Sequence, residues 1–325
     1  MEKMEQRKNQ HIEYALSFHS EQNDDWDKIE LPLTSFPELD FTQISIKTEV
    51  MGFSMSSPFY INAMTGGSLR AKELNRQLAV LARECDLMLA MGSYSIVLRL
   101  PEAKESFDVI RREAPDIILG VNLGADKNAE DAKKAVEMSG ADFLQIHVNP
   151  LQEIIMPEGE RNFRGWLDNI AEISQNVKVP VMVKQVGFGM TREDIAKLIK
   201  IGVKTVDISG KGGTNFAKIE NARRENLYPS LENLGMDTIS SLQTAAAFQD
   251  KIEIIASGGI KNALQIAKAL SMGARAVGIA GQILYLLEKD GLERTIAKVK
   301  AWQEELKILY LLCGVQNTKE INKKA

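Results

Sequence analysis

The amino-acid sequence predicts an α/β protein, a (β/α)8 barrel of the TIM type with an N-terminal extension. Eight short apolar runs recur along the chain, and a helix-like segment follows each of them. The runs are apolar throughout rather than alternating, which is typical of parallel strands buried on both faces. An open doubly wound sheet is the structural alternative. Such a sheet usually carries a glycine fingerprint after its first strand, and this sequence lacks one.

The extension is expected at residues 1–57, packed on the barrel or across its mouth. It contains a charged N-terminal helix, a loop, and short strands at Ile29–Leu33 and Ile44–Gly52. Residues 58–325 are expected to form the catalytic barrel, so that the chain is one domain overall. The eight barrel strands are predicted at Pro58–Ala63, Leu87–Met91, Ile117–Val121, Phe143–His147, Pro180–Lys184, Lys204–Ser209, Glu253–Ser257 and Ala276–Ala280.

The segments between the predicted strands carry helix signals. Ala129–Gly140 has an apolar stripe and closes on glycine, the usual helix stop. Thr191–Gly202 opens with a capping-box pattern. Gly291–Cys313 is expected to be the last outer helix. The longest connection, Gly210–Gly235, is of a length that usually serves function or motion.

Composition excludes several classes of function. The 40 Lys and Arg residues nearly balance 44 Asp and Glu residues, so the charge does not suggest a nucleic-acid partner. Cys85 and Cys313 are far apart in sequence and are expected to be buried free thiols. The charged N-terminus lacks the apolar core of a signal peptide, and no run is long enough to span a membrane. A cytoplasmic protein without a membrane partner is expected.

The segment Phe143–Glu153 carries the strongest functional signal. His147 ends a strand, and Asn149, Gln152 and Glu153 follow at once around a proline. Barrel enzymes place their reacting groups at the carboxyl ends of strands, so this cluster is a candidate active site. The alternative is an Asx/Pro turn with polar side chains.

Other strand ends suggest a flavin mononucleotide. Lys184 follows a buried strand, where an unpaired cation is costly without an anionic partner. Glycines follow the seventh and eighth strands, where barrels commonly bind phosphate. A lysine at the flavin N1/O2 edge would stabilise negative charge there. For the remaining polar strand ends, Ser93, Asn122 and the loop Ser209–Thr214, helix caps or plain turns are the alternatives.

At these residues the chain resembles the type 2 isopentenyl-diphosphate isomerases, which are flavin-dependent enzymes of isoprenoid synthesis. The matching phrases run from Arg7 to Gly281: RKNQHI, INAMTGG, LQIHVNPLQEIIMPEGERNFRGW, PVMVKQVGFGM, DISGKGGTNFAKIE and IIASGGI. The continuation PEGER-x-F-x-G-W is typical of this family rather than of flavin barrels in general.

The resemblance implies a role for each matching residue. Arg7, Lys8 and His11 would bind the substrate diphosphate, and Glu153 would bind Mg²⁺. Gln152, His147 and Asn149 would line the substrate pocket, with Gln152, His147 and Lys184 as the catalytic set. The implied FMN contacts are Ala63, Met64, Thr65, Ser93, Asn122, Lys184, Ser209, Thr214, Gly258, Gly259, Ala280 and Gly281.

The implied reaction converts isopentenyl diphosphate into dimethylallyl diphosphate by moving a double bond. Because an imidazolium is a weak acid for an alkene, His147 is a poor proton donor, and reduced FMN is the expected acid and base. NADPH would only reduce the flavin beforehand, and a homotetramer or homo-octamer is expected. Two departures from the family pattern are Tyr94-Ser95, where Gln-Arg is frequent, and Phe216, where tryptophan is frequent.

Three other functions are kept open. An FMN-dependent 2-hydroxy-acid oxidase or dehydrogenase would need an arginine for the substrate carboxylate and a histidine base near the seventh strand, and 247–262 contains neither. A nucleotide dehydrogenase would need a cysteine in the loop after the sixth strand, which has none. A non-catalytic flavin- or phosphate-binding protein would leave the cluster at His147–Glu153 unexplained.

Overall fold

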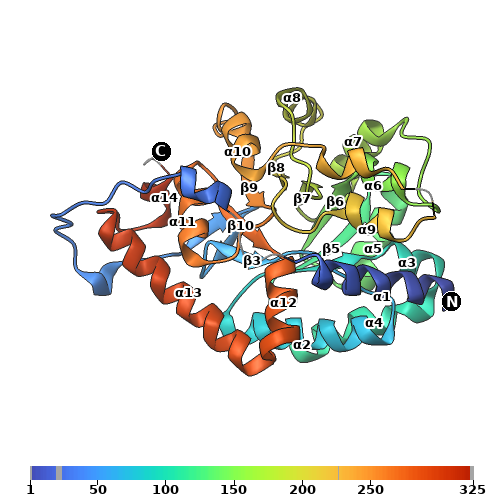
Figure 1. The fold of residues 1–325 in the computed structure, drawn as a ribbon, viewed down its shortest axis with the longest axis horizontal. Coiled ribbons are helices and arrows are strands. Elements are labelled where there is room, and N and C mark those ends of the chain that lie inside the picture. Colours follow the sequence, from blue (N-terminus) through green and yellow to red (C-terminus); the bar gives the residue numbers. More distant parts are fainter. Residues whose placement is uncertain (1, 20–23, 226, 323–325) are drawn as a thin grey trace.

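The structure is a computed structural model that describes residues 2–19, 24–225 and 227–322. Eight parallel strands form a closed barrel in the order β10-β3-β4-β5-β6-β7-β8-β9, which confirms the predicted fold class (Figure 1). The strands lie within three residues of the predicted ones. They are β3 (Phe59–Ile61), β4 (Leu89–Ser93), β5 (Leu119–Gly124), β6 (Phe143–Val148), β7 (Val181–Gln185), β8 (Thr205–Asp207), β9 (Glu253–Ser257) and β10 (Ala276–Ile279).

Helices cover the outside of the barrel, and several begin and end at the predicted signals. Asn128 caps α5, and Gly140 ends it in the left-handed conformation. Thr191 forms the predicted capping box of α8 with Asp194. The helices after β3 are α2 (Leu69–Cys85), α3 (Ser95–Arg99), α4 (Glu105–Glu113), α5 (Ala129–Ser139), α6 (Pro150–Ile155), α7 (Trp166–Asn176), α8 (Arg192–Lys200), α9 (Phe216–Ala222), α10 (Thr238–Ala246), α11 (Ala263–Ser271), α12 (Gly281–Asp290), α13 (Leu292–Leu312) and α14 (Thr318–Ile321).

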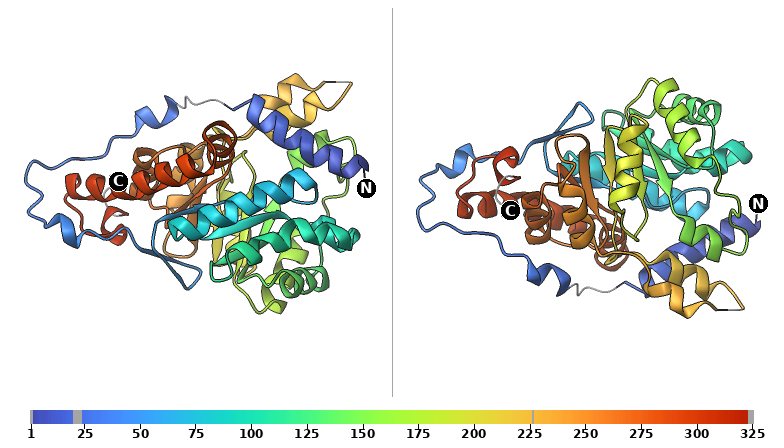
Figure 2. Two further views of the ribbon diagram at one scale, coloured as in Figure 1. Left: turned by 90° about the horizontal axis from the view of Figure 1, so that it is seen from below. Right: turned by 90° about the horizontal axis from the view of Figure 1, so that it is seen from above.

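The N-terminal segment wraps the barrel from one end to the other (Figure 2). Helix α1 (Glu2–Ser17) lies at the mouth, and the hairpin of β1 (Thr48–Val50) and β2 (Phe53–Met55) lies at the opposite end. The strand predicted at Ile29–Leu33 is wrong, since this stretch has no regular structure. The residues on either side of this stretch contact helices rather than the edge of a sheet. The Trp26 carbonyl accepts a hydrogen bond from Lys268 of α11, and the Thr34 N–H donates to the Leu312 carbonyl at the end of α13.

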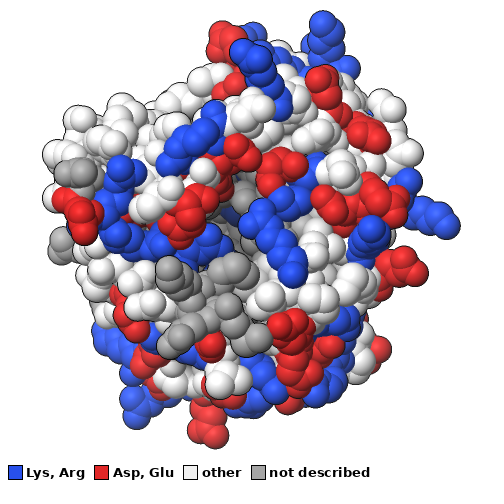
Figure 3. All heavy atoms as spheres, turned by 90° about the vertical axis from the view of Figure 1, so that its right-hand side faces the viewer, with Lys and Arg blue, Asp and Glu red and all other residues white. Residues whose placement is uncertain are grey.

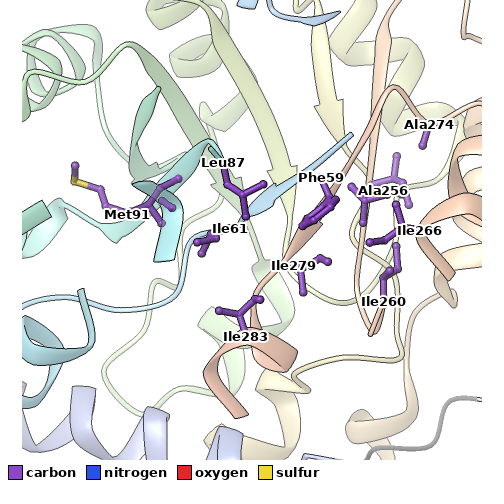
Figure 4. Close-up of a cluster of buried hydrophobic side chains, with 14 of the residues drawn as sticks. Phe59, Ile61, Leu87, Met91, Ala256, Ile260, Ile266, Ala274, Ile279 and Ile283 are labelled. Carbon is purple, nitrogen blue, oxygen red and sulfur yellow. The ribbon is translucent and has the colours of Figure 1, made fainter. Parts of the chain in front are cut away.

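The barrel interior has an apolar lower half. Val50 and Met55 of the hairpin pack with Phe143, Met182 and other buried side chains inside the barrel. A second, larger core fills the space between the strands and the outer helices, and Figure 4 shows the part of it around β3, β9 and β10. Because apolar packing closes the lower end, polar groups of the interior gather at the carboxyl ends of the strands.

Cys85 and Cys313 are both buried and form no disulfide, which confirms their expected state. Over the described part of the chain, no helix combines the length and the apolar character that a membrane span requires.

Candidate active site

A cavity of about 130 Å³ opens at the carboxyl ends of β3, β7, β8, β9 and β10, with α1 over it. Ten of the twelve residues predicted to contact flavin line this cavity. They are Ala63, Met64, Thr65, Lys184, Ser209, Thr214, Gly258, Gly259, Ala280 and Gly281. Side chains that are 200 residues apart in sequence therefore meet in one site, because the closed barrel brings all strand ends to one rim.

The other two predicted flavin residues, Ser93 and Asn122, do not line the cavity. The Ser93 hydroxyl donates to the Ser95 hydroxyl at 3.2 Å. Asn122 is buried, and its amide donates to the Gln145 side chain at 3.2 Å. Its carbonyl oxygen lies 2.8 Å from Nδ1 of His147. The structure thus gives Asn122 a role in orienting the imidazole of His147.

The loops after β8, β9 and β10 form a cradle of backbone groups. Gly258 and Gly259 have φ angles of +97° and +81°, which side chains of other residues rarely tolerate. A Cβ on Gly213 would lie 2.8 Å from the Gly259 nitrogen, so the two loops touch through their backbones. Helix α12 begins at Gly281, and its cap residue Ala280 makes no side-chain cap bond. Open N–H groups at a helix start suit a phosphate.

These residues fit a flavin mononucleotide. The cradle matches its phosphate, and the hydroxyl oxygen of Thr65 is buried without a hydrogen-bond partner among the described residues. Lys184 lies at the floor of the cavity and is paired with Asp207 of the next strand, with Nζ 3.0 Å from the carboxylate. Sequence reasoning missed Asp207, although a carboxylate inside an apolar strand was a visible signal.

Helix α1 places Lys8 and His11 in the lining of the same cavity, and burial lowers the pKa of His11 below its ordinary value. Burial, reinforced by the charge of Arg7 and partly opposed by Glu220, lowers the pKa of Lys8 to about 8. Arg7 lies 3.6 Å from Glu158, and its Nε is buried without a hydrogen-bond partner among the described residues. A buried Arg7 donor without a described partner, next to an ammonium whose charged form is disfavoured by burial, is the arrangement expected of an anion-binding site.

Gln152 is held from both sides. Its side-chain N–H donates to Glu220 at 3.0 Å, and its side-chain oxygen accepts from Asn149 at 3.1 Å. Asn149 also caps α6, because its side-chain oxygen accepts from the Gln152 backbone N–H. Both side chains are thereby fixed at the start of the helix that follows β6, as the Phe143–Glu153 segment suggested.

Glu220 of α9 is a central residue that sequence reasoning did not single out. It is fully buried and contacts His11 at 3.0 Å, Gln152, and the guanidinium of Arg223. Burial alone would raise the pKa of Glu220, but the contacts with His11, Gln152 and Arg223 outweigh it and lower the pKa. A negative charge thus stands behind Gln152 at neutral pH. The residue ends the phrase GGTNFAKIE, but only the fold shows that it contacts His11 and Gln152.

Glu153 lies at the edge of this cluster. Its carboxylate accepts from the Glu160 backbone N–H at 2.8 Å, and burial raises the pKa of Glu153 above its ordinary value, partly opposed by that bond. Within the described ranges no three His, Cys, Asp or Glu residues gather as a metal cage. A divalent cation here would need most of its ligands from substrate oxygens and water, as is usual for Mg²⁺.

His147 is neutral at physiological pH. Burial lowers the pKa of His147 to about 4, opposed by Asp126 and reinforced by Lys8, Lys184 and Lys127. Since the Asn122 amide donates to Gln145, its oxygen accepts the Nδ1–H of His147, which leaves Nε2 as an acceptor. An imidazole in this state has no proton to give to an alkene.

The two departures from the family pattern have structural roles. Tyr94 is fully buried against Phe107, with ring centroids 5.0 Å apart. Phe216 turns its edge toward the His11 ring at 6.0 Å and lines the cavity. On the molecular face that carries the N-terminal end of α1, Lys and Arg side chains border a hollow, interspersed with Asp and Glu (Figure 3).

The chain is similar in sequence to curated proteins over nearly its full length. A protein of Latilactobacillus sakei named isopentenyl-diphosphate delta-isomerase is 46% identical over 96% of this chain and 89% of its own. Proteins of the same name from Staphylococcus haemolyticus and Staphylococcus aureus are each 42% identical over 98% of this chain, and over 91% and 92% of their own lengths. A family model described as FMN-dependent dehydrogenase matches residues 116–325.

Solved structures share the fold at low sequence identity. A flavocytochrome b2 with benzoylformate has a TM-score of 0.67 at 20% identity, over 97% of this chain and 78% of its own. A mandelate oxidase with a monooxide FMN adduct has a TM-score of 0.64 at 14% identity, over 96% and 90%. The oxidase-like barrel is therefore common to proteins with different chemistry, and the fold alone does not select the reaction.

Proposed function

The chain belongs to the isopentenyl-diphosphate delta-isomerase family, and from that premise we propose that it converts isopentenyl diphosphate into dimethylallyl diphosphate. The reaction moves a double bond within the substrate, and the protein is an FMN-dependent isomerase. The oxidase alternative is disfavoured, because the relatives with high identity are isomerases and the oxidases share only the fold.

One observation carries the proposal. Lys8 and His11 of α1 line the same cavity as Lys184 and the glycine cradle, so an ammonium and an imidazole for a diphosphate face the flavin site directly. The buried Nε of Arg7, which has no partner among the described residues, adds a donor at this point. A 2-hydroxy acid carries a single carboxylate and would not require both Arg7 and Lys8 on a helix over the cavity.

The bound flavin supplies the acid and base for the alkene when it is reduced. Within the chain, Lys184 would stand beside the ring, Thr65 and Ser209 would hold its edges, and the loops at Gly258 and Gly281 would hold its phosphate. The cavity is smaller than the roughly 300–1,000 Å³ usual for ligand sites. Since α1 lies over it, we infer that α1 shifts to admit the cofactor.

The chain's own polar groups then serve the substrate. We assign Gln152 to the hydrocarbon end of the substrate and Glu220 to holding the Gln152 amide from behind, while the flavin remains the acid and base. The lowered pKa of Glu220 keeps this carboxylate ionised, and His11 and Arg223 hold its two oxygens. His147, neutral and fixed by Asn122, would line the pocket and orient the substrate through Nε2.

Further parts of the proposal concern partners. Glu153 would hold Mg²⁺, which neutralises the diphosphate. NADPH would reduce the flavin, because the net reaction consumes no electrons. The protein would act as a homotetramer or homo-octamer in the cytoplasm, in which case a neighbouring subunit could contact the exposed apolar side chains Leu33 and Phe36.

The test is a product assay on the purified protein. Isopentenyl diphosphate, Mg²⁺, FMN and NADPH should yield dimethylallyl diphosphate, and the product should be absent when the reductant is left out. A parallel reaction with lactate or mandelate under oxygen should yield no oxo acid. Turnover of the hydroxy acid without isomerisation of the diphosphate would reverse the assignment in favour of the oxidase.

A further inference from the structure

An ion pair lies inside the barrel at the floor of the cavity. Asp207 and Lys184 occupy paired positions on neighbouring strands β8 and β7, with Nζ 3.0 Å from Oδ2. The side chain of Asp207 is fully buried, and that of Lys184 is 8% exposed. No step of the proposed reaction uses Asp207, so its place in the barrel needs a separate explanation.

Asp207 is held by four donors. Its Oδ1 accepts from the Ser257 hydroxyl at 2.6 Å and from the Ser209 backbone N–H at 3.1 Å. Its Oδ2 accepts from the Asn62 side chain at 2.9 Å and from Lys184. A carboxylate offers about four lone-pair positions, so all of them are used, and the group is fixed in orientation.

Lys184 is held by longer hydrogen bonds than Asp207. Its three protons are directed to Asp207, to the Gln185 carbonyl at 3.2 Å and to the Ser257 hydroxyl at 3.4 Å. To donate to a ligand the ammonium must release one of them, and the contact with Ser257 is the longest. Lys184 can then donate to a ligand in the cavity while it keeps its hydrogen bond to Asp207.

We propose that Asp207 is a positioning residue that anchors Lys184 and offsets its charge, so that a bound flavin gains less stabilisation of negative charge than it would beside an unpaired lysine. The inference rests on the proposed function only in requiring that FMN occupies the cavity. Such a site suits a reaction without net electron transfer, because the flavin need not oxidise the substrate. Opposite charges this close in a buried site strongly reduce each other's field.

The test is sulfite titration of the FMN-loaded protein, followed by flavin absorbance. Sulfite adds to oxidised flavin and leaves negative charge at the N1 edge, so its affinity reports the charge that Lys184 presents. Asp207→Asn should bind sulfite at least tenfold more tightly than the wild type. An affinity within twofold of the wild type, with FMN bound, would overturn the proposal.

Ser257→Ala is the matched control, because it removes one hydrogen bond of Asp207 and the longest contact of Lys184 but keeps both charges. Its sulfite affinity should stay within threefold of the wild type, and a rise equal to that of Asp207→Asn would show that geometry rather than charge is responsible. Should Asp207→Asn fail to fold, Lys184→Met/Asp207→Asn is compared with Lys184→Met. The double variant should bind sulfite more tightly than Lys184→Met, because it lacks the carboxylate whose negative charge opposes the adduct, and equal affinities would contradict the charge offset.

The product assay separates this inference from the proposed function. Sulfite titration requires only bound FMN, so it can be read even if no dimethylallyl product forms. A wild-type protein that binds no FMN would contradict the proposed function itself, and flavin absorbance reveals this before any variant is compared.

Discussion

Replacing Glu220 by glutamine should impair both the reaction and the attachment of α1. The carboxylate is fully buried and contacts His11, Gln152 and Arg223, so its charge is compensated mainly by these neighbours. A glutamine can still accept from Gln152 but leaves Arg223 and His11 without a buried anion. Breaking one partner of such a cluster costs about 2–4 kcal/mol.

This loss predicts a measurable shift in melting temperature. The entropy of unfolding for 325 residues is roughly 0.7 kcal/mol/K near 60 °C, so the expected decrease in Tm is about 3–6 °C. If Glu220 also positions the Gln152 amide during the reaction, kcat should fall by about 10²-fold. Calorimetry and initial rates with saturating substrate measure the two effects separately.

Glu158→Gln is the matched control. Glu158 contacts the same Arg223, but its side chain is 40% exposed, so its loss should cost at most about 1 kcal/mol. It should leave kcat within threefold. An E220Q protein with wild-type kcat would refute the role of Glu220 in positioning Gln152, and equal Tm shifts for the two variants would refute the burial argument.

Four further outcomes are expected. Glu153→Gln should raise the Mg²⁺ concentration for half-maximal activity at least tenfold with FMN still bound, and loss of FMN would contradict the metal assignment. Lys184→Ala should weaken FMN binding or the reduction of FMN by NADPH, both measured by flavin absorbance. A yellow variant with full activity would contradict the position of Lys184 beside the flavin. Because the pKa of Lys8 is about 8, pyrophosphate affinity of the protein, measured by calorimetry, should fall as pH rises from 7 to 9, and Lys8→Arg should remove this dependence. The pKa of His147 is lowered to about 4, so the folded state binds fewer protons than the unfolded state between pH 6.5 and 4. The free energy of unfolding should therefore fall by about 2–3 kcal/mol as pH drops from 6.5 to 4. Denaturant titrations of His147→Gln should show a weaker fall, and an unchanged profile would count against a neutral His147.

Local patterns were sufficient to predict the barrel. Each strand is an apolar run ended by polar or glycine residues, and each cap such as Asn128 or Thr191 acts within a few residues of its partner. The predicted strand at Ile29–Leu33 was wrong because local pattern does not supply a partner strand. A strand needs a second strand for its backbone hydrogen bonds, and this stretch lies among helices instead of at a sheet edge. The contacts of Asn122 with His147 and Gln145 also depend on the pairing of neighbouring strands, so its flavin contact stays a prediction.

The sequence by itself determined the fold class, the strand ends and ten of the residues that line the cavity, because barrel topology brings the ends of its strands to one rim. Only the tertiary structure decided how these residues are charged and held. Glu220 becomes part of the site through contacts with His11 and Gln152, 209 and 68 positions away. Asp207 meets Lys184 only because β7 and β8 are paired in register. Such long-range pairings leave no periodic trace in the chain, since their energies arise from burial that exists only once the barrel has closed.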